Sequence, residues 1–152
     1  PATKPKTTRT EIMDAQRKEI ARDVAASAAD GTRDFGQIVG TLMESGFDGY
    51  LVDYRAATQA FYLPDGSSHV VDIHRPETPV AATFDAAAVR EAIREAQTKA
   101  VGYTYLGFGE KVARAGCAGY LVTFSGKRVL YFGRDGQTHT EFFPGAGPVA
   151  TD

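Results

Sequence analysis

The sequence contains a single cysteine, Cys117, and no tryptophan or asparagine. One cysteine excludes an internal disulfide and is typical of a reducing compartment, which predicts a cytoplasmic protein. The lack of asparagine excludes N-glycosylation of the chain. No apolar run approaches the roughly 20 residues that a membrane-spanning helix requires, so no membrane partner is expected.

The chain also lacks a strong charge of either sign, since its formal net charge is −2 over 152 residues. With 43% hydrophobic residues, it has the composition of a soluble globular protein of one domain. Nucleic acid is not a favoured partner, because binding it requires a basic face across a folded domain. We expect residues 1–9 and 146–152 to be flexible tails on a single domain at 10–145.

What the chain does contain is an internal repeat. The segment that begins at Gly46 aligns without a gap with the segment that begins at Gly116. A gapless match of this length predicts an internal duplication. The aligned positions include Gly49 with Gly119, Tyr50-Leu51-Val52 with Tyr120-Leu121-Val122, Tyr54 with Phe124, Asp65-Gly66 with Asp135-Gly136, and His69 with His139.

Each copy has the pattern of one helix followed by three strands, at about 34–74 and 104–144. Apolar residues recur at helical spacing before Gly46, and they alternate with polar ones from Tyr50 to Arg55. The Asp-Gly turn of each copy then closes a hairpin. Because about 40 residues cannot bury a stable core alone, we expect both copies to form one pseudo-twofold α+β domain. Whether their strands form one sheet or two stays open.

Two further helices are expected outside the repeat. Residues 10–29 have the pattern of an N-terminal helix, and residues 84–100 that of a helix between the copies. The second has an apolar stripe at Val89, Ile93 and Ala96, which is typical of a helix with one buried face.

The second copy, "AGCAGYLVTFSGKRVLYFGRDGQTHTEFFP", resembles the C-terminal signature of the YdfO/YbcV-like family of small bacterial proteins. That family is prophage-associated, and some members are labelled phage envelope proteins. The first copy, "LMESGFDGYLVDYRAATQAFYLPDG", is similar to the family's N-terminal half. The resemblance implies a small α+β domain with no established activity, cofactor or catalytic residue.

The duplicated histidines, His69 and His139, are the first candidates for a functional site. If a twofold axis relates the copies, it could bring both imidazoles to one cleft, where they could act as general bases or ligands. The alternative is structural, since a histidine after a turn can hydrogen-bond the loop and shared ancestry alone would place it twice.

Further candidates come from the strands. Tyr50, Tyr120 and Tyr62 belong to an aromatic set that is either a stacking platform or, as is more usual on strands, core. Asp53 and Arg55 share one strand face and are either an ion pair facing a cleft or an exposed pair.

No metal or cofactor is expected. Asp72, His74 and Glu141 offer metal-ligating groups, but the chain has no HxH, HxxxH or CxxC spacing. Cys117 aligns with Phe47, which indicates an apolar packing position rather than a nucleophile.

The sequence therefore favours a non-enzymatic module that binds an unidentified small molecule or protein in the groove between the two repeats. One alternative is an enzyme whose acid and base are His69 and His139. Another is a phage-related structural or interaction protein, which would act through a homodimer and present an exposed apolar patch or a free sheet edge.

Overall fold

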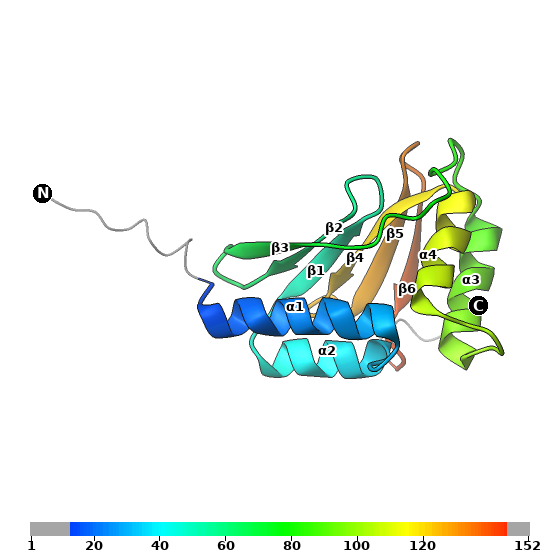
Figure 1. The fold of residues 1–152 in the computed structure, drawn as a ribbon. Helices are drawn as coiled ribbons and strands as arrows, with labels where there is room; N and C mark the ends of the chain where they lie inside the picture. Colours follow the sequence, from blue (N-terminus) through cyan, green and yellow to red (C-terminus); the bar gives the residue numbers. More distant parts are fainter. Residues whose placement is uncertain (1–12, 146–152) are drawn as a thin grey trace, which may run out of the picture.

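Six antiparallel strands form one sheet in the order β3-β2-β1-β4-β5-β6, and helices cover one of its faces (Figure 1). The computed structural model describes residues 13–145, so the tails predicted at 1–9 and 146–152 lie outside the described residues. The α+β class predicted from the sequence is confirmed. The copies contribute to a single sheet, which answers the question that the sequence left open.

The described residues contain four helices and six strands. Their bounds are α1 Ala15–Asp30, α2 Phe35–Glu44, β1 Gly49–Asp53, β2 Thr58–Tyr62, β3 Ser68–Asp72, α3 Ala86–Thr98, α4 Tyr105–Arg114, β4 Cys117–Thr123, β5 Arg128–Gly133 and β6 Thr138–Phe142.

A side-chain cap fixes the start of every helix in residues 13–145. Each capping oxygen accepts a backbone N–H three residues on, which satisfies a donor that the first turn leaves unpaired. Gly31 ends α1 in the left-handed conformation, with φ of 80°. None of these helices is long and apolar enough to cross a membrane. The caps are Asp14, Asp34, Asp85 and Thr104.

The same order of elements occurs twice along the chain. α1-α2-β1-β2-β3 is followed by α3-α4-β4-β5-β6. The sequence analysis placed the first helix and the inter-repeat helix outside the repeat, yet α1 precedes α2 as α3 precedes α4. Each half therefore has five elements, and the first helix of each carries too little sequence similarity to reveal this.

The two halves meet where β1 pairs with β4. Leu51 lies directly opposite Leu121, its counterpart in the sequence repeat. On either side, Tyr50 pairs with Val122 and Val52 pairs with Tyr120. Because β1 and β4 are the central pair, β3 and β6 form the two outer edges of the sheet.

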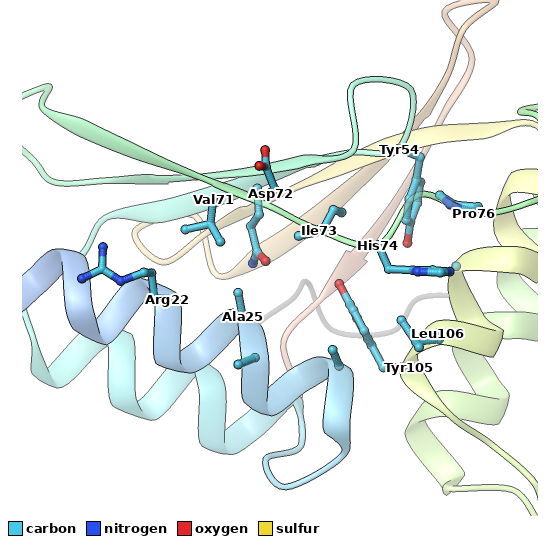
Figure 2. A pocket seen from close by; sticks show the side chains of 14 residues that line it. Arg22, Ala25, Tyr54, Val71, Asp72, Ile73, His74, Pro76, Tyr105 and Leu106 are labelled. Carbon is cyan, nitrogen blue, oxygen red and sulfur yellow. The ribbon is translucent and has the colours of Figure 1, made fainter.

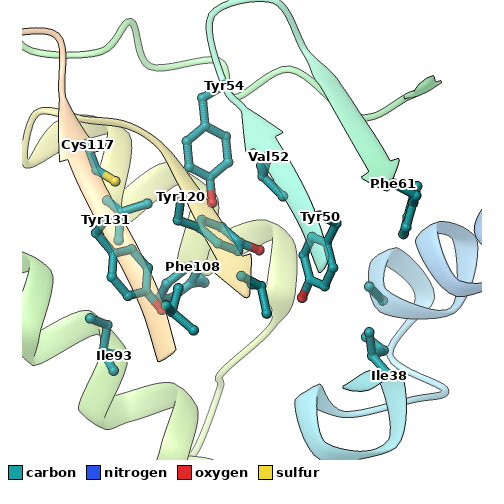
Figure 3. Packing of buried hydrophobic residues seen from close by; sticks show 14 of the residues in the cluster. Ile38, Tyr50, Val52, Tyr54, Phe61, Ile93, Phe108, Cys117, Tyr120 and Tyr131 are labelled. Carbon is teal, nitrogen blue, oxygen red and sulfur yellow. The ribbon is translucent and has the colours of Figure 1, made fainter. Parts of the chain in front are cut away.

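The core lies between the helices and the covered face of the sheet, and it is rich in aromatic rings (Figure 3). Tyr120 and Tyr131 lie with ring centroids 5.3 Å apart, and Phe108 of α4 contacts the Tyr131 ring edge-on. Tyr50 and Tyr120 are both buried. The interpretation of these two tyrosines as core residues is confirmed.

The opposite face of the sheet, here called the outer face, is not covered by any helix of residues 13–145. On this face, five residues that are paired across five adjacent strands form a row, and all five side chains are apolar. Its residues are partly or fully exposed, in contrast to their buried neighbours in each strand. The row consists of Val70, Ala60, Leu51, Leu121 and Leu130.

Candidate functional site

A cavity of about 320 Å³ lies between α1, the strands of the first half and α4 (Figure 2). Both halves contribute to it, because α4 belongs to the second half. We call it the Tyr54–Gln59 pocket, after its two buried polar residues. Its apolar wall includes Ala25, Ala29, Val71, Ile73, Pro76 and Leu106.

Two buried polar side chains lie in this wall, and the hydroxyl of one has no hydrogen-bond partner within residues 13–145. Tyr54 is 5% exposed, and its hydroxyl makes no hydrogen bond. Gln59 is 4% exposed and lines the same pocket. A buried polar group without a partner costs about 1–3 kcal/mol. The Tyr54 hydroxyl therefore reduces the stability of the fold unless something outside the chain satisfies it.

Tyr105 adds a second hydroxyl to the pocket. Figure 2 shows it extending from α4 toward Tyr54, which descends from the end of β1. The Tyr105 hydroxyl is 2.8 Å from that of Tyr120 and is therefore already paired. Burial raises the pKa of Tyr54 and of Tyr105, so both phenols are neutral at physiological pH.

The charged groups of the pocket are confined to its rim. Arg22, Asp72 and His74 line it and are exposed. Arg22 is paired with Glu19 of the same helix, at 2.6 Å. The interior thus presents neutral hydrogen-bonding groups within an apolar wall.

Glu110 of α4 fixes the loop that closes one side of the pocket. Its carboxylate accepts the backbone N–H of Glu77 at 2.7 Å and of Thr78 at 3.1 Å. These bonds lower the pKa of Glu110. Pro76, which precedes them in the loop, is buried against the pocket.

Comparison of the two halves shows that the polar groups of the pocket belong to the first half alone. Tyr54 aligns with Phe124, and Gln59 aligns with Val129. Phe124 and Val129 are both buried, so an apolar side chain suits the equivalent position. This difference between the copies was visible in the sequence. The sequence analysis missed it because it searched for features that the copies share.

The structure does not bring His69 and His139 together. They lie on β3 and β6, the opposite edges of the sheet. Five strand spacings of about 4.8 Å separate the two edges, or roughly 24 Å. The expectation that both histidines meet in one cleft is therefore wrong, because β1 and β4 are the central strands and β3 and β6 are the two edges.

Each histidine has its own local surroundings. Partial burial lowers the pKa of His69, and the positive charges of Lys18 and Arg22 on α1 lower it further. His139 lies 2.6 Å from the Glu141 carboxylate, two residues along the same strand. Neither residue lines the Tyr54–Gln59 pocket.

The other predicted site residues also lie outside the pocket. Tyr50 and Tyr120 are in the core, although Tyr120 holds the hydroxyl of Tyr105. Tyr62 lies on β2 at a position that belongs to the outer face of the sheet.

Asp53 and Arg55 form no ion pair facing a cleft. The Asp53 carboxylate instead accepts the backbone N–H groups of Arg55 and Ala56, each at 3.0 Å, and the Arg55 side chain is exposed. This local cap ends β1 at Asp53, two residues before the predicted end of the strand. Asp53 therefore has a structural role in the turn.

The metal-ligating groups considered from the sequence are dispersed. Asp72 and His74 lie on or after β3, whereas Glu141 lies on β6 at the far edge. Among residues 13–145, no three His, Cys, Asp or Glu side chains form a cluster that could hold a metal ion.

Cys117 is fully buried, and burial raises the pKa of its thiol to about 11. The thiol donates to the backbone carbonyl of Gly119 at 3.2 Å. A nucleophilic cysteine requires a lowered pKa and access to solvent. Cys117 is thus a packing residue.

Comparison with models of known protein families finds no match to the chain, and no curated protein is similar to it. The resemblance to the YdfO/YbcV-like family stays a prediction. The case for a function therefore depends on the geometry of the pocket.

Proposed function

We propose that the protein binds a small, mainly apolar molecule in the Tyr54–Gln59 pocket. The observation that carries this proposal is the buried, unpartnered hydroxyl of Tyr54, which lines a cavity of about 320 Å³ together with the buried Gln59 side chain. Small-molecule sites have this character, with an apolar lining and a few polar groups that orient the ligand, and they range from about 300 to 1,000 Å³.

The energetic cost of the buried Tyr54 hydroxyl supports a role for it beyond folding. Phe124 and Val129 occupy the aligned positions of the second half and are buried without any polar atom to satisfy. The fold therefore accommodates apolar residues at such positions. Polar groups that reduce stability are typical of functional sites, where a ligand provides the missing partner.

Protein-observed NMR with a library of neutral, anionic and cationic aromatic fragments tests the proposal. Ligands should shift resonances of residues around the pocket, and Ala25→Phe should abolish binding because Ala25 lies in the pocket wall. Ala15→Phe is the matched control, since Ala15 is exposed on the same helix and does not line the pocket. Binding that survives Ala25→Phe, or shifts confined to other surfaces, would contradict the proposal.

Catalysis by His69 and His139 is not proposed. That hypothesis required both imidazoles in one cleft, and the strand order keeps them at opposite edges of the sheet. Within the Tyr54–Gln59 pocket, the raised pKa values of Tyr54 and Tyr105 also make these phenols poor general bases.

Self-association through the outer face is a second candidate function, and the apolar row from Val70 to Leu130 favours it. The rows on either side contain the charged residues Asp53, Asp72 and Arg128 as well as the aromatic residues Tyr62, Phe132 and Phe142. Charged groups at the edge of an apolar centre are found in many protein interfaces. A twofold axis in the plane of this face would lay the row of one copy on the same row of another. Such self-complementarity is what a twofold homodimer requires.

Sedimentation velocity over a range of protein concentrations tests this second candidate. Leu121→Lys should shift the protein toward monomer, because it places a charge at the centre of the row. Val101→Lys is the control, since Val101 is fully exposed in the loop between α3 and α4. A wild-type protein that is monomeric at every concentration would overturn this candidate.

We also propose that the chain arose by internal duplication of a five-element unit, α-α-β-β-β. The order of elements and the pairing of Leu51 with Leu121 support this origin. An experimental structure would test it by superposition of the two halves. Halves that superimpose over the strands and over α2 and α4, with α1 and α3 in unrelated positions, would restrict the duplication to the four-element unit predicted from the sequence.

A further inference from the structure

We infer that the ligand of the Tyr54–Gln59 pocket is a neutral molecule with an apolar ring or chain and one amide-like edge that both donates and accepts a hydrogen bond. This inference rests on the proposed function and adds the chemical class of the ligand. It comes from the hydrogen-bonding capacity of Gln59, the neutrality of the interior and the composition of the wall.

Gln59 determines the hydrogen-bonding pattern of the ligand. A primary amide offers an N–H donor and a carbonyl acceptor side by side. Gln59 is buried and lines the pocket. A ligand that satisfies both at once must present a neighbouring acceptor and donor, as a carboxamide or a lactam does. The unpaired Tyr54 hydroxyl lines the same pocket and can serve the second lone pair of a ligand carbonyl.

The electrostatics of the pocket exclude a charged group at the buried end of the ligand. Arg22, Asp72 and His74 are the lining residues with charged or titratable side chains near neutral pH, and all three are exposed at the rim. An ionised carboxylate or ammonium group next to Gln59 would lose its hydration without gaining an opposite charge, which is strongly unfavourable. A neutral amide loses less hydration and recovers its hydrogen bonds.

The remaining wall determines the body of the ligand. Val71 and Ile73 of the first half face Leu106 of α4 across the cavity, with Ala25 of α1 on a third side. These side chains offer no hydrogen bond, so the body of the ligand is apolar. The volume of about 320 Å³ lies near the lower end for small-molecule sites and suits a compact bicyclic compound.

Three probes of similar size and shape test the inference by isothermal titration calorimetry with the full chain. Quinolin-2-one has a lactam edge, 1-methylquinolin-2-one has the same edge with its donor blocked, and 2-naphthoate is a carboxylate anion. Quinolin-2-one should bind at least tenfold more tightly than either of the others. A site built to hydrogen-bond a group discriminates strongly against analogues that lack it.

The outcomes separate this inference from the proposed function. If all three probes bind with similar affinity, or if 2-naphthoate binds best, the pocket is a ligand site but the amide-edge inference is wrong. If no probe binds and the fragment library also fails, the proposed function itself is overturned. Tight binding of quinolin-2-one alone supports both.

Two variants test which side chains of the pocket hydrogen-bond the amide edge of the probe. Gln59→Leu should reduce the affinity for quinolin-2-one at least tenfold and that for 1-methylquinolin-2-one by a smaller factor, since the methylated compound can lose only the bond from the Gln59 N–H to its carbonyl. Tyr54→Phe should reduce the affinity for quinolin-2-one by a smaller factor, since the hydroxyl provides a second bond to the carbonyl. Unchanged affinity of Gln59→Leu for quinolin-2-one would overturn the inference. If this variant failed to fold, the comparison of the three probes on the wild type would still decide.

Discussion

Gly49 and Gly119 lie at opposite ends of the β1–β4 pair, and each places its α-carbon against a backbone carbonyl of the facing strand. A Cβ on Gly49 would lie 2.2 Å from the carbonyl oxygen of Val122, and one on Gly119 would lie 2.2 Å from that of Val52. The two contacts are equivalent under the sequence repeat. They explain physically why both copies contain glycine directly before the Tyr-Leu-Val segment.

Gly119→Ala should therefore destabilise the protein by about 3 kcal/mol, because overpacking a backbone contact forces the central strands apart. Urea unfolding followed by circular dichroism measures the change. Gly40→Ala is the control, since Gly40 lies within α2 and its Cβ would meet no atom within 4 Å. That variant should gain about 0.5–1 kcal/mol from helix propensity. Equal effects of the two substitutions would contradict the steric explanation.

Tyr54→Phe and Tyr105→Phe should change stability in opposite directions. The Tyr54 hydroxyl is buried without a partner, so its removal should leave stability unchanged or raise it by about 1 kcal/mol. The Tyr105 hydroxyl pairs with that of Tyr120, so its removal should cost about 1–2 kcal/mol and leave the Tyr120 hydroxyl unpaired. Thermal unfolding of the variants without added ligand checks this prediction. A clear loss of stability in Tyr54→Phe would show that its hydroxyl has an internal partner.

Glu110 should contribute to stability at neutral pH and not in acid. Its pKa lies below the ordinary value of 4.5 because its carboxylate accepts the N–H groups of Glu77 and Thr78. A lowered folded-state pKa means that the unfolded chain binds the proton more tightly. The contribution is therefore complete above the ordinary pKa and is lost as the pH falls through the folded-state pKa.

Glu110→Gln should accordingly lower the melting temperature at pH 7, and the difference from the wild type should shrink below the ordinary pKa of 4.5. Differential scanning calorimetry at several pH values measures this dependence. Glu91→Gln is the control, since Glu91 makes an exposed contact with Arg94 within α3. A Glu110→Gln difference that is independent of pH would contradict the assignment to the carboxylate.

Cys117 should resist thiol reagents in the folded protein. Its side chain is fully buried, and burial raises the pKa of the thiol to about 11, so little thiolate forms at pH 8. Reaction with 5,5′-dithiobis(2-nitrobenzoate) should be slow in buffer and complete within the mixing time in denaturant. Rapid labelling without denaturant would mean that β4 opens locally.

Much of the local structure could be predicted from the sequence. Asp34 and the apolar spacing that follows it determine the start of α2, and the Asp65-Gly66 and Asp135-Gly136 pairs determine the hairpins. These signals act over a few residues, so they do not depend on the rest of the fold. The matching places of α1 and α3 in the order of elements were missed because a surface helix tolerates many residues as long as one face is apolar.

The candidate site was largely missed. His69 and His139 attracted attention as the same residue in both copies, but equivalent residues on the third strand of each half lie at the two edges of a single sheet. The informative positions were those where the copies differ, Tyr54 against Phe124 and Gln59 against Val129. Only burial makes these differences significant, because an exposed hydroxyl or amide is satisfied by water.

By itself, the sequence determined the elements, their order and the repeat, since helix caps, turn residues and apolar periodicity are encoded locally. The tertiary structure alone decided that β1 pairs with β4, which joins the halves into one sheet and carries the histidines apart. It also decided that α1 and α4 enclose the Tyr54–Gln59 pocket beside the first half's strands. Contacts between segments far apart in the chain depend on the shape and polarity of the surfaces that pack together. Local sequence signals such as caps, turns and periodicity do not specify that packing.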